Sequence, residues 1–183
     1  MMEAARMIAK SGAKPKRTIV FIGFAGEEFG LLGAQAWVKA HKDKLPKIAN
    51  LFNRDGGPEP PVGISVPQAM YDDFVKISEP IQKIRPDYPF EVKVREPRKR
   101  PTRMGGTDAS VFAIEGVPTL GFTTEDFKGY DFDYGEIWHT ERDLYTKNIP
   151  EYQEHTATVT AIIALGVANL DKQLSREGLY TEE

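Results

Sequence analysis

Residues 17 to 37, RTIVFIGFAGEEFGLLGAQAW, restrict the possible folds more than any other stretch of this chain. Residues 18–24 form a short, mostly apolar run that is rich in β-branched and aromatic side chains. Such a run is typical of a central strand covered on both faces. Gly26 closes the strand, and the small residues of 30–34 open a helix that can pack closely on a sheet. A strand, a tight turn and a helix in this order predict an α/β fold.

The turn between this strand and helix carries two adjacent carboxylates, Glu27 and Glu28. Function in open α/β sheets gathers at the carboxyl ends of strands, where this pair lies. Neighbouring side chains on a turn point in different directions, so one carboxylate could hold a metal while the other moves a proton. The alternative is a pair of first-turn acids favoured by the helix dipole. The pair alone leaves both interpretations open.

The amino-acid composition limits the kinds of partner and metal site that this chain can have. A length of 183 residues suits one domain with its own core, and 40% hydrophobic with 28% charged residues is ordinary for a globular protein. A formal net charge of -3 gives no reason to expect a nucleic-acid partner. Because the chain has no cysteine, any metal would be held by Asp, Glu and His. The sequence shows neither a membrane-spanning apolar run nor a signal peptide.

The rest of the chain reads as one domain without internal repeats. Apolar periodicity predicts helices at 1–10, about 30–41, 68–84, 109–115 and 151–174. It predicts further strands at 48–53, 62–66, 90–94 and 117–122. The polar tail 175–183 is expected to fray.

Two further positions carry groups that suit a metal. Asp55 ends the predicted strand 48–53 and precedes two glycines, which exposes a carboxylate, although Asp-Gly is also a common simple turn. His139 follows Trp138 in a loop between sheet and helix, where a purely structural role is hard to find. His41 lies on a polar helix end and is expected to be solvated rather than a ligand, and His155 lies in a predicted helix and is expected to be structural.

Four sequence motifs, in the same order along the chain, resemble those of the co-catalytic zinc exopeptidases, a family that includes bacterial leucyl aminopeptidases, plasma glutamate carboxypeptidase and glutamate carboxypeptidase II. The motifs are FIGFAGEEFGLLGAQAW, Asn53-Arg54-Asp55, Gly106-Thr107-Asp108 through Gly116-Val117-Pro118, and Trp138-His139-Thr140. The resemblance covers nearly the whole chain in the right order. It implies a three-layer helix-sheet-helix domain with a mixed, mostly parallel sheet.

The resemblance also implies roles for individual residues. Glu27 would be the general base that takes a proton from a metal-held water. Glu28 and His139 would bind one zinc, and Asp55 a second. Asp108 would support the site from outside the metal ligands or contact substrate, as would two aromatic residues, Trp138 and Tyr134. The substrate would be a peptide or dipeptide.

The chain departs from the family pattern in one important respect. The family carries a His-x-Asp motif and a metal-bridging Asp ahead of the Glu-Glu turn, and this sequence has neither. We therefore expect residues 1–183 to be the C-terminal part of a longer domain, without its first strands, and to hydrolyse little alone. Localisation is open, with export expected for the full-length protein from its relatives.

Two other functions are compatible with the same resemblance. Peptidase-like domains in transferrin-receptor-like proteins have lost their metals and serve as binding modules, although Glu27, Glu28, Asp55 and His139 together argue against such a loss here. Glutaminyl-cyclase-like acyltransferases share the fold and bind one zinc. The GEEFGLLGA helix start looks more like the peptidases.

Overall fold

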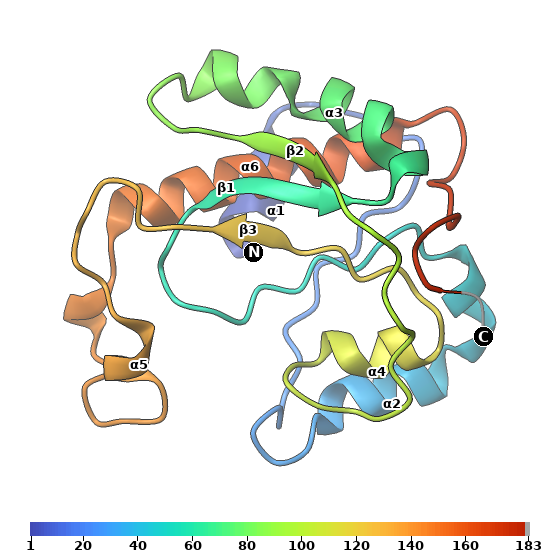
Figure 1. Cartoon of the computed structure of the whole chain (residues 1–183), viewed down its shortest axis with the longest axis horizontal. Coiled ribbons are helices and arrows are strands. Elements are labelled where there is room, and N and C mark those ends of the chain that lie inside the picture. Colours follow the sequence, from blue (N-terminus) through green and yellow to red (C-terminus); the bar gives the residue numbers. More distant parts are fainter. Residues whose placement is uncertain (182–183) are drawn as a thin grey trace.

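A computed structural model describes residues 1–181 of the chain. The fold is α/β, with a small sheet flanked by helices (Figure 1). The helices are α1 (Met2–Lys10), α2 (Leu32–Ala40), α3 (Tyr71–Ile84), α4 (Ala109–Ile114), α5 (Tyr134–Ile137) and α6 (Pro150–Asn169), with 3-10 turns η1 (Lys42–Lys47), η2 (Gln68–Met70) and η3 (Tyr145–Lys147). The strands are β1 (Pro61–Val66), β2 (Glu91–Val94) and β3 (Phe122–Thr124).

The sheet has the order β2-β1-β3 and is mixed. The central strand β1 runs parallel to β2, with Ile64 opposite Val92, and antiparallel to β3, with Ile64 opposite Phe122. A Cβ atom at Gly63 would come within 2.4 Å of the carbonyl oxygen of Glu91, so only glycine allows these two backbones to approach so closely. The expected mostly parallel sheet is therefore corrected to one parallel and one antiparallel pair among the described residues.

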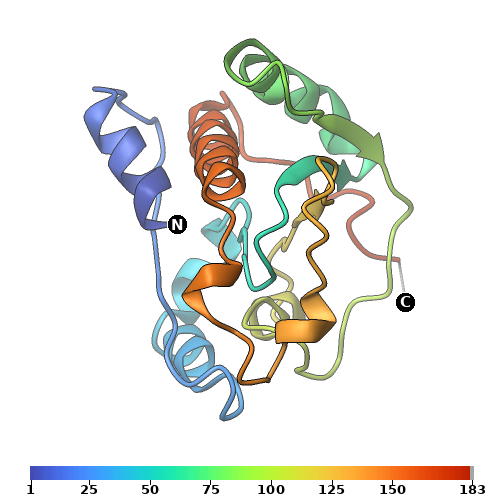
Figure 2. The same cartoon turned by 90° about the vertical axis from the view of Figure 1, so that its left-hand side faces the viewer.

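The main hydrophobic core lies between α3, α6 and the sheet. Apolar residues of α3 recur every three or four positions, at Phe74, Ile77 and Ile81, so they form one buried stripe. Helix α6 crosses α3 at Gly166, where a Cβ would lie 2.4 Å from the Cγ2 atom of Ile77. Helix α1 packs on α6, on the side away from α3 (Figure 2).

A second, smaller hydrophobic cluster joins α2 to α4. In both views these two helices lie together, below β3 and away from α3 (Figures 1 and 2). Phe112 is fully buried between Phe24 and Trp37, with ring centroids 5.7 and 5.4 Å away. The Glu27-Glu28 turn and Asp108 lie next to this cluster in the chain, whereas the sheet belongs to the main core. The candidate site thus draws on both clusters.

Two predicted strands are absent from the described residues. Residues 18–24 take no part in a sheet ladder, and Val20 is 63% exposed rather than buried. A buried strand needs a hydrogen-bonded neighbour, and residues 1–181 supply none to this segment. Residues 48–53 are held differently: the side-chain amide of Asn50 accepts from the N–H of Leu120 at 2.9 Å and donates to its carbonyl at 3.3 Å. The predicted strand 117–122 overlaps β3 by one residue.

The C-terminal segment after α6 packs against the body of the chain as far as it is described. Helix α6 ends at Asn169, earlier than predicted. Leu179 is 1% exposed, and the N–H of Thr181 donates to the carbonyl of Arg98 at 3.1 Å. Arg176 donates to the carbonyls of Pro46, Ile48 and Gly116. The expected fraying is therefore not seen for 175–181, and 182–183 lie outside the described residues.

Within residues 1–181, none of the helices combines the length and the apolar character that a membrane crossing requires.

Candidate functional site

The Glu27-Glu28 turn is fixed by backbone hydrogen bonds. The N–H groups of Gly30 and Leu31 both donate to the carbonyl of Glu27, at 3.0 and 2.8 Å. Leu31 adopts a left-handed backbone with φ 60° just before α2 begins, so the chain reverses sharply here. The turn leaves Glu28 exposed and Glu27 half-buried.

Gly33 holds α2 against the end of the segment that precedes the turn. Its N–H donates to the carbonyl of Ala25 at 2.8 Å, and a Cβ would lie 2.7 Å from both the N and the O of Ala25. We expect Gly33→Ala to lower the free energy of unfolding by about 1–3 kcal/mol, because backbone atoms must move. Urea denaturation measures this effect. Gly105→Ala, where a Cβ meets open space, should change it by less than about 0.5 kcal/mol, and equal effects would contradict the explanation.

His139 faces Glu28 across the site. The Nε2 atom of His139 lies 3.0 Å from the Oε1 atom of Glu28, although the residues are 111 positions apart, and both side chains are largely exposed. The backbone of His139 is left-handed, with φ 56°, which is uncommon for a residue other than glycine, although histidine adopts it more often than most residues do. The ring of Trp138 lies 4.5 Å from the imidazole. The loop after α5 therefore aims the imidazole at the Glu27-Glu28 turn.

Three further carboxylates interact electrostatically at this point. Burial raises the pKa of Glu27 above its ordinary value, and the negative charges of Asp55, Glu28 and Asp108 raise it further, while His139 opposes them. Burial also raises the pKa of Asp108, with a contribution from Asp55. Asp108 is 7% exposed, and its Oδ1 atom has no hydrogen-bond partner among the described residues. Electrostatic interactions thus link the four predicted carboxylates and His139, and among the described residues the direct contact is that of Glu28 with His139.

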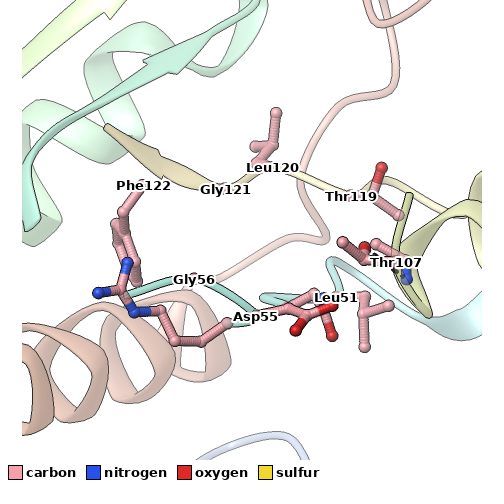
Figure 3. A pocket seen from close by; sticks show the side chains of 11 residues that line it. Leu51, Asp55, Gly56, Thr107, Thr119, Leu120, Gly121 and Phe122 are labelled. Atoms are coloured by element: carbon pink, nitrogen blue, oxygen red, sulfur yellow. Dashed lines mark hydrogen bonds between the residues drawn. The ribbon is translucent and has the colours of Figure 1, made fainter. Parts of the chain in front are cut away.

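A hollow of about 250 Å³ opens beside Asp55 (Figure 3). Its lining includes Leu51, Thr107, Leu120 and Gly121. Arg54 also lines this hollow, and sequence reasoning did not single it out; its position beside Asp55 was the available signal.

The two aromatic candidates lie at the edge of the site. Tyr134 packs over the loop after Asp55, since a Cβ at Gly57 would come within 3.1 Å of its ring. Trp138 is 57% exposed, and its backbone N–H donates to the carbonyl of Tyr134 at 2.9 Å. Neither residue lines the hollow beside Asp55. Both are accessible from solvent, as a substrate contact requires.

The fit to zinc is partial. Two ligand atoms on a tetrahedral zinc lie about 3.3 Å apart at the usual bond lengths of about 2.0–2.1 Å. The Glu28–His139 separation of 3.0 Å is that of a direct hydrogen bond and is somewhat shorter than this value. Across residues 1–181, however, no group of three or more Asp, Glu and His side chains is arranged to hold a metal. The described residues therefore offer a ligand pair, not a complete set.

Of the two other histidines, His155 is buried and structural, as predicted, whereas His41 was expected to be solvated and is half-buried. The ring of His41 stacks on Trp37 at 4.4 Å, and its Nδ1 atom lies 2.9 Å from the Trp37 carbonyl. His155 is fully buried, stacks on Tyr88 at 3.9 Å and places Nε2 3.0 Å from the carbonyl of Pro61.

Comparison with known proteins shows the family. The model of peptidase family M28 matches residues 1–163. This chain belongs to peptidase family M28. Carboxypeptidase Q of Mus musculus is 24% identical over 179 residues, which cover 95% of this chain and 34% of that protein. A probable zinc metalloprotease of Phaeosphaeria nodorum is 46% identical over 54 residues, 30% of this chain and 10% of its own length.

Two solved structures share the fold of this chain. The peptidase M28 precursor of Shewanella amazonensis matches with a TM-score of 0.71 and 26% identity, covering 94% of this chain and 36% of that one. The LapA aminopeptidase of Legionella pneumophila matches with a TM-score of 0.63 and 21% identity, covering 93% and 44%. The M28 chain described here spans about a third of the length of the carboxypeptidase Q proteins that it matches.

Proposed function

We propose that this chain provides part of the zinc centre of an exopeptidase that hydrolyses peptides or dipeptides. The observation that carries the proposal is the approach of His139 to Glu28 at 3.0 Å, beside Glu27. Membership of peptidase family M28 supports the reaction class. In this proposal Glu28 and His139 hold one zinc, and Asp55 holds a second.

Glu27 is proposed as the general base. Its pKa is raised by burial and by the surrounding carboxylates, which brings the group closer to the pH at which a base works best. It would take a proton from water at its carboxylate oxygens and return it to the leaving amine. When bound, zinc would lower the pKa of the attacking water and polarise the scissile carbonyl.

The remaining candidates would orient the reacting groups. Asp108 is buried and interacts with Asp55, so it would restrict how that carboxylate turns toward a metal. Tyr134 and Trp138 would contact the substrate from the loop that carries His139. Aminopeptidases, dipeptidases and carboxypeptidases can share such a ligand set, so the proposal extends to exopeptidases as a class.

Because the described residues offer only a ligand pair, we propose that the missing ligands come from a segment of the same domain outside this chain. The proposal then requires weak zinc binding by the 183-residue chain alone. It also requires that this weak binding depend on His139.

A zinc titration of the 183-residue chain tests the assignment. We expect weak binding that His139→Ala reduces by at least about 10- to 100-fold, the effect that losing even an outer-shell partner has. His41→Ala is the matched control and should bind zinc as the parent does, because His41 lies on Trp37. Competition with a chromophoric chelator measures each affinity.

Two results would contradict the proposal. One is zinc affinity that is unchanged in His139→Ala. The other is tight binding of two zinc ions with turnover of an aminoacyl-p-nitroanilide or dipeptide by this chain, which would show that the ligand set is complete.

A further inference from the structure

The hollow beside Asp55 contains a cation whose orientation is fixed by the backbone. Arg54 uses one nitrogen, Nη2, to donate to the carbonyls of Gly57 and Glu59, both at 2.5 Å. The loop therefore wraps around the guanidinium and restricts its rotation. Figure 3 shows the hollow between Asp55 and the start of β3 at Phe122.

The charge of Arg54 has no close counter-ion. Among residues 1–181, no carboxylate forms an ion pair with this guanidinium. Glu59 interacts with it only at longer range, and the Oε2 atom of Glu59 accepts from the hydroxyl of Thr124 at 3.1 Å. Desolvation by the surrounding loop lowers the pKa of Arg54, but the side chain is exposed and a guanidinium stays charged in proteins.

Two of the three guanidinium nitrogens are left for a ligand. Nη1 and Nε have no hydrogen-bond partner among the described residues, because the two recorded bonds both start from Nη2. Arg54 is exposed, so these two nitrogens can be reached from solvent, and a charged donor without a counter-ion favours an anionic acceptor. Since the side chain is already held in place, a ligand loses less free energy in ordering it.

We propose that Arg54 selects substrates that place a carboxylate in this hollow, either an acidic side chain or a free C-terminal carboxylate. This inference rests on the proposed peptidase function for its biological meaning, whereas carboxylate binding itself requires no hydrolysis. The carboxylate would accept hydrogen bonds from Nη1 or Nε, since Nη2 already donates to two carbonyls. In the same hollow Asp55 lies toward Leu51 and Thr107 (Figure 3). An anionic ligand would therefore bind away from Asp55, at the guanidinium that the carbonyls of Gly57 and Glu59 hold.

Three small probes separate the sources of the carboxylate. N-acetyl-glutamic acid α-amide carries it only in the side chain, and N-acetyl-glutamine only at the C-terminus. N-acetyl-glutamine α-amide has none and is the neutral reference. Affinities for the 183-residue chain are measured by NMR titration in chloride buffer with EDTA, so that no metal contributes. The measured quantity is the affinity of each anionic probe divided by that of the neutral probe.

For at least one anionic probe, we expect Arg54→Gln to lower this ratio about fivefold or more, while Arg54→Lys retains most of it. Glu59→Gln removes the longer-range negative charge but keeps the backbone carbonyl that accepts from Arg54. It should raise the ratio by about threefold. This second variant keeps the inference testable if Arg54→Gln does not fold.

The inference is overturned if neither anionic probe binds, or if the ratio is unchanged in Arg54→Gln and Glu59→Gln. Failure of the zinc titration with success of these titrations would remove the peptidase assignment and leave the carboxylate site. The reverse result would leave the peptidase assignment without this selectivity.

Discussion

Phe74→Ala should lower the free energy of unfolding by about 3–5 kcal/mol. Phe74 is fully buried on the inner stripe of α3, in the core that α3, α6 and the sheet share. Truncation removes the apolar contacts of the ring and leaves a cavity that helices pinned at Gly166 cannot easily close. Since a domain of this size is stable by only about 5–15 kcal/mol, the loss is a large part of the total.

Chemical denaturation monitored by circular dichroism measures this loss. Val75 is the neighbouring residue on the same helix and is 38% exposed, so Val75→Ala is the matched control. It should change stability by no more than about 0.5 kcal/mol. A Phe74→Ala protein that loses less than about 1 kcal/mol would show that the main core is not packed as described.

Acidification from pH 7 to pH 4 should cost about 3 kcal/mol of stability through His155 alone. Burial lowers the pKa of His155 to about 4, and the positive charges of Arg85 and Lys128 act in the same direction, while the Pro61 carbonyl opposes them. The unfolded chain binds a proton near the ordinary pKa of 6.5, which the folded chain does not. This stabilisation is therefore complete above about pH 6.5 and is lost as the pH falls through the interval toward 4.

His155→Phe isolates this contribution. It keeps a ring to stack on Tyr88 but cannot take up a proton, so stability should fall by about 2–3 kcal/mol less between pH 7 and pH 4.5 than in the parent. The loss of the hydrogen bond to the Pro61 carbonyl lowers the free energy of unfolding by about 1 kcal/mol at every pH, so it does not change how that free energy depends on pH. Thr156→Val, one residue along, should retain the parent's pH dependence. Parallel curves for parent and His155→Phe would refute the explanation.

The hydrophobic pattern of a segment was sufficient to predict those helices and strands whose buried face can be recognised from their own residues. The stripe of Phe74, Ile77 and Ile81 marks α3, and the short apolar run at 62–66 marks β1. Both elements bury these residues where the periodicity indicated. Such predictions hold because burial of one face is decided within the segment itself.

Predictions failed where the structure of a segment depends on another segment that its own hydrophobic pattern does not identify. Residues 18–24 have the composition of a buried strand, but Val20 is exposed because no neighbour in the described residues pairs with this segment. Asn50 replaces a ladder by bonding the backbone of Leu120 through its side chain, which no alternation reveals. The tail was expected to fray because it is polar, yet Leu179 is buried.

The candidate site was predictable to the extent that each side chain follows an element end. The meeting of Glu28 and His139 matches the predicted convergence, whereas their roles as zinc ligands stay predictions. Arg54 was missed because its importance comes from the absence of a counter-ion nearby, a property of three-dimensional surroundings. The unpaired oxygen of Asp108 was invisible in sequence for the same reason.

The packing of α1 on α6 has a consequence during synthesis on the ribosome. Helix α6 begins at Pro150, 140 residues after α1 ends at Lys10. At about 5–20 residues per second, α1 waits on the order of ten seconds before its neighbour has been translated. The central strand β1 likewise waits for β3. Nascent chains of this protein therefore leave the face of α1 that packs on α6 uncovered until α6 has been translated.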